Sequence, residues 1–368
     1  MASPKKSKIR VNLGPKIQLY HHKVHSKSPI DLQNPALPIL KLAGRSSPQY
    51  QFWMLCTVVF FLVGVYGFVF WDTMTQSPRF KVKSNNWEQM RRRFDIHMEN
   101  VRAKDDNRYD EGLLMHQHQN TGAKPNMVAI GCAITSRAYQ DLNLENLQYR
   151  LPLLRTLLPS FCNTASSGYD YHFYVSFDVD DSNLQRSDFL NGIYEHFQKV
   201  TQTLCPKEAN VTLHFVQCSH SRNPAWAQND AMMEAYLDDA EYYYRVNDDT
   251  LMLSPGWTES YVEALGGFDP PFVGVVGPVH KGGNEFILTY DFVHKTHIDI
   301  FGYYYPRLFT DWWADDWMTA VYGSERTIKL PGVRLKHTQE AGQRYKVQYD
   351  NGELVHYQIA YDRKTLNR

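Results

Sequence analysis

The sequence predicts an α/β fold, a mostly parallel sheet flanked by helices, preceded by a disordered tail, one transmembrane helix and a stem. Across residues 126–368, short apolar runs alternate with segments of helical spacing, which is the order of βαβ units. The first run, residues 127–134, is almost continuously apolar, as in a strand buried on both faces of a sheet. No Gly-x-Gly-x-x-Gly follows this run, so the fingerprint of a dinucleotide-binding fold is missing.

The remaining elements follow from runs of apolar residues, helical periodicity and turn residues. Further strands are expected at residues 171–177, 211–216, 242–246, 272–277 and 333–336. Helices are expected at 142–158, 189–200, 224–236, 257–265 and 354–366, with one more running from the acidic motif near residue 315 to residue 322.

The N-terminal part predicts a membrane anchor. Residues 52–71 are twenty positions without a charge, with aromatic residues at both ends, which is long enough as a helix to cross the hydrocarbon core of a bilayer. Residues 1–51 carry nine Lys or Arg and one acid and are expected to form a disordered, basic cytoplasmic tail. Residues 72–125 are polar and predict a stem with a helix around residues 87–103. The catalytic domain is placed at residues 126–368.

The cysteines and one sequon bear on the compartment. Cys56 lies in the apolar span, and the other four cysteines allow three disulfide pairings, which the sequence leaves open; they are Cys132, Cys162, Cys205 and Cys218. Asn210-Val-Thr is a glycosylation sequon. With the basic tail in the cytoplasm, these features favour a single-pass type II protein whose domain is lumenal. No nucleic-acid motif is present.

The motif with the clearest chemistry is Asn247-Asp248-Asp249, which directly follows the aromatic run 242–246. Ligands bind at the carboxyl ends of strands in open α/β sheets, and clustered oxygen donors suit Mg²⁺ or Mn²⁺. A simple acidic turn that caps the next segment is the alternative interpretation.

Three further features follow expected elements: Gly282-Gly283, the pair Asp315-Asp316 at a helix start, and His337 at a strand end. In this order, and behind an anchor, the motifs resemble the nucleotide-sugar glycosyltransferases of the GT-A fold, which are type II Golgi enzymes with a metal-binding Asp-x-Asp. The resemblance covers roughly residues 126–350. It departs from the family pattern at Asn247, which replaces the first Asp.

The resemblance implies a metal site. Asp249 would be the main ligand of Mn²⁺ (or Mg²⁺), with Asp248 beside the ribose or bridging through water, and His337 would complete the site. It also implies a base, for which Asp316 is preferred over Asp315. Each of these acids could instead cap its helix.

Other residues are candidates for contacts with the donor or the acceptor. Gly282, Gly283, Asn247 and Arg137 are expected on the donor side, together with Asp178 and Asp180. The turn formed by Asp178, Asp180 and Asp181 is a rival metal site with better Asp-x-Asp spacing. Arg344 and Tyr345 are expected near the diphosphate. Trp312, Trp313 and Trp317 could form a sugar-stacking wall, and the alternative is that these rings belong to the core.

These features predict a Golgi (or ER) membrane enzyme that transfers a sugar from a nucleotide sugar, UDP-linked by expectation, to a hydroxyl acceptor of a glycan or protein, with inversion. One rival is a metal-dependent hydrolase or phosphotransferase that uses the Asp pairs. The other is a catalytically inactive GT-A lectin or assembly protein, which Asn247 keeps open.

Overall fold

A computed structural model describes residues 80–109, 126–281, 284, 286–338, 344–345 and 347–367. Residues 77–368 belong to one compact unit. Its strands are β1 (Val82–Asn85), β2 (Asn126–Ile134), β3 (Tyr169–Phe177), β4 (Asn210–Cys218), β5 (Tyr242–Arg245), β6 (Thr250–Met252), β7 (Val275–Lys281), β8 (Phe292–His294) and β9 (Thr327–His337). Its α-helices are α2 (Trp87–Tyr109), α3 (Leu147–Arg150), α4 (Leu158–Cys162), α5 (Ser187–Leu204), α6 (Pro224–Leu237), α7 (Trp257–Gly266), α8 (Thr296–Phe301), α9 (Ala314–Val321) and α10 (Val355–Leu366).

The described strands form one mixed sheet in the order β1-β4-β3-β2-β5-β8-β7-β9-β6. The first five strands in this order are parallel, β8 runs antiparallel to its neighbours, and β6 pairs antiparallel with β9. The carboxyl ends of β2, β3, β4 and β5 therefore meet at one edge of the sheet. This confirms the predicted α/β class with a mostly parallel first half.

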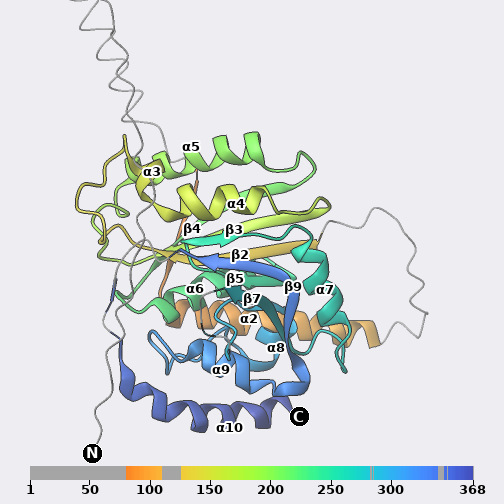
Figure 1. Ribbon diagram of the computed structural model, residues 1–368. Helices are drawn as coiled ribbons and strands as arrows, with labels where there is room; N and C mark the ends of the chain where they lie inside the picture. The colour runs from red at the N-terminus through yellow and green to blue at the C-terminus, as the bar shows by residue number, and fades with distance from the viewer. Residues whose placement is uncertain are drawn as a thin grey trace, which may run out of the picture. The chain divides into compact units, whose positions relative to one another are not determined.

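Helices cover both faces of the sheet. In Figure 1, α3, α4 and α5 lie on one side of the strands, and α6, α2, α8, α9 and α10 lie on the other. Each side has its own apolar core. The first core includes Phe173 of β3 and Trp257 of α7, and the second includes Met232 of α6 and Trp317 of α9. Because β2 is buried on both faces, its sequence is an almost unbroken apolar run, whereas β4 has partly exposed polar positions.

The folded unit begins before residue 126. Strand β1 pairs in parallel with β4, and Met90 and Phe94 of α2 are buried against the second core. The boundary at 125/126 therefore places two elements of the domain in the stem, which is a correction. The helix predicted around residues 87–103 is present as α2, but its strongly polar sequence gives no sign that it packs on the core of the domain.

Two predicted strand limits also differ. The run 272–277 yields a strand only from Val275, because Phe272 has a positive φ of 65° that ends extended backbone. Strand β9 begins at Thr327 rather than Val333, because its first half pairs with β7 through the backbone while several of its side chains stay exposed.

Among the described residues, no helix is long and apolar enough to cross a membrane. The predicted anchor, residues 52–71, lies outside the described residues, as do Gly282 and Gly283. The disulfide left open by the sequence joins Cys162 and Cys205, and Cys132 and Cys218 are free and buried.

Candidate functional site

The acidic turn begins where β5 ends. The Asn247 N–H donates to Thr250 Oγ1 over 3.1 Å, and the Thr250 N–H donates back to the Asn247 carbonyl over 3.1 Å. This reciprocal pair closes a tight turn around Asp248 and Asp249, which are 3% and 1% exposed. Two carboxylates are thus buried at the ligand-binding edge of the sheet, where an unpaired charge is costly.

The strand pairing brings His337 to this turn. In the antiparallel pair of β6 and β9, Thr250 lies opposite His337, and the Thr338 N–H donates to the Asp249 carbonyl over 3.2 Å. His337 Nε2 consequently lies 3.0 Å from Asp249 Oδ1. The register of β6 against β9 therefore brings together Asp249 and His337, which lie 88 residues apart in the sequence.

Arg344 neutralises the carboxylates. One guanidinium nitrogen lies 2.8 and 2.9 Å from the two oxygens of Asp248, and the other lies 3.4 Å from Asp249 Oδ2. Burial raises the pKa of Asp248 in spite of Arg344. Burial also opposes ionisation of Asp249, but the neighbouring His337 and Arg344 outweigh it and lower its pKa. Asp249 is the better anionic ligand of the two.

The residues fit a divalent cation. Asp249 Oδ1 is buried and lies 3.0 Å from His337 Nε2, without a well-aligned hydrogen bond. A carboxylate oxygen and an imidazole nitrogen that share one point are donors that Mn²⁺ accepts. Asp248 turns its oxygens to Arg344 and is the weaker candidate for direct ligation.

The carboxylates of the rival metal turn at the end of β3 are already paired with neighbouring protein groups. Arg137 is paired with both Asp178 and Asp180. Asp181 accepts hydrogen bonds from the Thr135 hydroxyl, over 2.9 Å, and from the Ser136 N–H, over 2.8 Å. These contacts join the ends of β2 and β3 and leave this turn a poorer metal site than Asp249 and His337. They also hold Arg137 in an ion pair.

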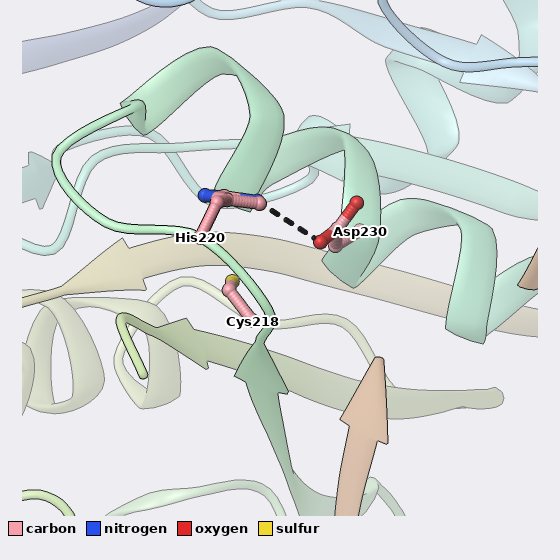
Figure 2. A group of neighbouring side chains, drawn as sticks. All are labelled: Cys218, His220 and Asp230. Carbon is pink, nitrogen blue, oxygen red and sulfur yellow. Dashed lines mark hydrogen bonds and ion pairs between the residues drawn. The ribbon is translucent and has the colours of Figure 1, made fainter. Parts of the chain in front are cut away.

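A third group of potential ligands lies at the end of β4 and on α6. Figure 2 shows His220 facing Asp230, at 3.1 Å between Nε2 and Oδ2, with Cys218 beside them. Asp230 is also paired with Arg307 at 3.1 Å, and burial raises the pKa of the Cys218 thiol well above its usual range. The carboxylate already has a cationic partner and the thiol stays protonated. We therefore interpret the group as support for the adjoining loop, in which the Arg222 N–H donates to Asp178 over 2.9 Å.

The acidic pair begins α9. The Asp316 N–H donates to Asp315 Oδ1 over 3.2 Å, and neither carboxylate caps the helix, whose N-cap is Trp313 without a side-chain hydrogen bond. Burial, followed by the charge of Asp315, raises the pKa of Asp316 to about 6. Burial also raises the pKa of Asp315, against the positive charge of Arg245 at the end of β5. Asp316 therefore has a pKa suited to a general base near neutral pH.

The three tryptophans of the predicted wall separate into different roles. Trp317 is fully buried, and its indole N–H donates to Asp362 over 2.9 Å, so its assignment to the wall is wrong. Amphipathic spacing turns this position of α9 toward the core. Trp312 is 47% exposed. Trp313 is partly buried and holds a left-handed backbone at φ 75°.

Two residues beside the site were not singled out from the sequence. Both ring nitrogens of His280, on β7, are buried without a hydrogen-bond partner, and its ring centre lies 6.2 Å from that of His337. The Tyr290 ring lies 5.0 Å from His280, and its hydroxyl lies 3.5 Å from Asn247 Nδ2. Neither residue follows a recognisable motif, and only the strand order brings them to the acidic turn.

No protein-family model matches the chain, and no curated protein matches it. Solved structures similar to it include TarS of S. aureus, with 14% identity over 64% of this chain and a TM-score of 0.40. The chain spans 39% of that protein and 65% of TarS 1–349 in complex with UDP, for which the TM-score is 0.39. Another is the mannosyltransferase PcManGT from Pyrobaculum calidifontis in complex with GDP-Man and Mn²⁺, with 14% identity, coverage of 76% of each chain and a TM-score of 0.39.

These neighbours include glycosyltransferases and proteins solved with nucleotides or nucleotide sugars. At these TM-scores and identities, the likeness is too weak to assign the activity of this chain. The function proposed below rests on the site itself.

Proposed function

We propose that this protein is a metal-dependent glycosyltransferase that transfers a sugar from a nucleotide-sugar donor, UDP-linked by preference, to a hydroxyl acceptor with inversion. The observation that carries the proposal is the pair of Asp249 Oδ1 and His337 Nε2, 3.0 Å apart at the carboxyl end of β5 with Arg344 beside them. A set of cation ligands next to a guanidinium suits a diphosphate, because a bound metal ion and a guanidinium both interact favourably with phosphate oxygens.

Asp249 and His337 would hold Mn²⁺ or Mg²⁺, with Asp248 nearby. When bound, the ion supplies charge neutralisation to the diphosphate leaving group. Arg344, which here pairs with the two carboxylates, would then turn its fork to the diphosphate oxygens. Among the described donor-side candidates, Asn247 adjoins this point, while Arg137, Asp178 and Asp180 lie at the ends of β2 and β3 and are assigned to the nucleoside.

Asp316 is assigned as the base. The acceptor oxygen attacks the anomeric carbon as its proton passes to the Asp316 carboxylate. The bond from that carbon to the diphosphate oxygen breaks, and the diphosphate leaves with the electron pair. Attack from the side opposite the leaving group inverts the anomeric centre.

The proposal includes a single-pass type II anchor at residues 52–71 and a lumenal domain in the Golgi or ER. The Cys162–Cys205 disulfide supports an oxidising compartment. Asn210 is exposed at the start of β4, which suits its glycosylation. Protease protection of the domain in sealed microsomes tests this orientation, and cleavage of the domain without detergent would contradict it.

The experiment for the function is thermal unfolding of residues 77–368 with UDP and Mn²⁺, each alone and together. We expect stabilisation of about 2.7 kcal/mol at a hundredfold excess over Kd when both are present, and little with UDP alone. Asp249→Ala should abolish this shift because the cation ligand is gone. Asp95→Ala, which removes an exposed carboxylate on α2, is the matched control and should keep it.

Absence of a shift with UDP, GDP or CMP would refute the donor assignment and favour the hydrolase. A normal shift without transfer to any acceptor would favour the inactive lectin or assembly protein.

A further inference from the structure

Two exposed aromatic rings lie beside the start of α9. Trp312 is 47% exposed and Tyr349 is 65% exposed. Their ring centres are 5.8 Å apart and their planes meet at 78°. Two aromatic rings exposed side by side present an apolar surface edged by polar groups, a composition that ligand sites use. We call this pair the aromatic corner.

The corner is held in place by its neighbours. Asp311 accepts hydrogen bonds from the Trp312 N–H and, over 2.9 Å, from the Gln348 N–H. The Trp313 indole N–H lies 3.4 Å from the Gln348 carbonyl. The Trp313 ring also packs so closely on Gly352 that a Cβ there would lie 2.8 Å from it. Residues 311–313 and 348–352 are thus tied together, and the two rings are presented as a preformed surface.

The aromatic corner is linked to both halves of the proposed site. Burial raises the pKa of Tyr345, and Trp312 and Asp315 are among the neighbouring groups that act on its hydroxyl. The preceding residue, Arg344, holds Asp248 and Asp249. Trp312 also precedes Asp316 by four residues in the sequence. Burial raises the pKa of Asp316 to about 6, as a general base requires. With Asp316 as the proposed base, the corner is assigned to the acceptor side of the site.

We propose that the aromatic corner binds a sugar ring of the acceptor, so that the acceptor is a carbohydrate; this inference rests on the proposed glycosyltransferase function. The faces of pyranose rings carry C–H groups of slight positive charge, which stack on the negative face of an aromatic ring. Asp311, which adjoins Trp312 and accepts from two backbone N–H groups, has further lone pairs that can accept from a hydroxyl group at the edge of such a ring. A lipid chain would instead need a continuous apolar groove, and two exposed rings beside a carboxylate do not provide one.

The test is saturation-transfer NMR on the full-length protein with methyl glycosides of glucose, galactose, mannose and N-acetylglucosamine and with lactose. We expect transfer to at least one of them. Trp312→Ala and Tyr349→Ala should each weaken binding about tenfold, while Trp312→Phe should keep most of it because the apolar face remains. Tyr361→Ala, which removes a tyrosine that is 67% exposed on α10, is the matched control and should bind normally.

UDP with Mn²⁺ is titrated in parallel on the wild type to separate the two proposals. Binding of UDP with Mn²⁺ but of no glycoside, or glycoside binding that survives both alanine variants, would overturn the carbohydrate acceptor. Glycoside binding that depends on Trp312 without any nucleotide binding would refute the transferase but retain the corner as a carbohydrate site. Transfer to a peptide or lipid that is unaffected by both variants would also overturn the inference.

Discussion

At the residue scale, the carboxylates of this protein differ in how completely they are paired. Asp181 is surrounded by hydrogen-bond donors, and Asp178 and Asp180 are held by Arg137. Asp249 keeps one buried oxygen without a well-aligned hydrogen bond, directed at His337. Because a buried carboxylate oxygen without a well-aligned hydrogen bond is unfavourable, a cation held between Asp249 and His337 would stabilise it.

A pH prediction belongs to Asp316. Its pKa of about 6 means that the carboxylate form needed in a base predominates above that value, so transfer should rise as the pH passes through about 6. Asp316→Asn should lower the rate by roughly 10²–10⁴-fold and remove this rise. The pH profiles of the two proteins, measured with saturating donor and metal, test this. An unchanged profile in the variant would assign the titration to another group.

The raised pKa of Asp316 also affects the stability of the fold, which should fall over the pH range in which activity rises. A carboxyl with a raised pKa in the folded state stabilises the fold when protonated, and this contribution is lost as the pH rises from about 4 through about 6. Asp316→Asn should therefore melt at a temperature no lower than the wild type at pH 7. A large fall in Tm would indicate that lost structure, rather than a lost base, explains the loss of activity.

At the element scale, the pairing of β6 with β9 positions the residues of the candidate metal site. Thr250 pairs with His337, and β7 brings His280 beside it through the pairing of His280 with Leu335. A slip of one residue would turn His337 to the other face of the sheet and away from Asp249.

Gly277 on β7 offers a test of how tightly this part of the sheet is packed. A Cβ at Gly277 would lie 2.4 Å from the backbone oxygen of Tyr290, which cannot move without shifting β8. Gly277→Ala should cost about 1–3 kcal/mol, whereas Gly332→Ala on β9, where a Cβ meets open space, should stay within about 0.5 kcal/mol. Urea unfolding of both variants measures the difference. Equal costs would contradict the close packing.

The disulfide is a second prediction at this scale. It joins the end of α4 to the residue after α5 across 43 residues of sequence. Replacing Cys162 and Cys205 together by serine should lower the free energy of unfolding by about 2–4 kcal/mol. A reducing agent should destabilise the wild type by a similar amount and leave the double variant unchanged, because Cys132 and Cys218 are free thiols. Equal unfolding midpoints with and without the disulfide would refute this.

At the scale of the whole molecule, the domain depends on two elements that lie outside its predicted limits. Glu234 of α6 has a fully buried side chain whose cationic partners are Lys83, 3.4 Å away, and Arg93 of α2. Met90 and Phe94 complete the same core. The segment before residue 126 thus contributes both charge compensation and apolar contact.

We therefore expect residues 126–368 to be much less stable than residues 77–368. Removing β1 and α2 takes away both cationic partners of Glu234 and the burial of Met90 and Phe94, and fully burying one such apolar side chain contributes about 1.5–3 kcal/mol. Thermal unfolding of the two fragments measures the effect, with a Tm lower by about 10 °C or more in the short one. Equal Tm values would contradict the role of α2.

The sequence by itself determined the α/β class, most helices and strands of the sheet's first half, and the acidic turn at the end of β5. These are local properties, since buried parallel strands are continuous apolar runs and turns follow their residue types. It also predicted Asp316, Asp315 and His337 as candidates from their places at element ends, although their chemical roles stay predictions.

Tertiary structure alone decided what depends on contacts distant in the chain. The disulfide had three possible pairings by sequence, and only the packing of α4 on α5 selects Cys162 with Cys205. Strand β1 is not predicted, and the helix predicted around residues 87–103 is assigned to the stem, because the burial of both elements comes from partners more than 100 residues away. Register places His337 and His280 beside Asp249, and amphipathic packing buries Trp317 while leaving Trp312 exposed. Periodicity describes each element alone, whereas these results depend on how elements pair.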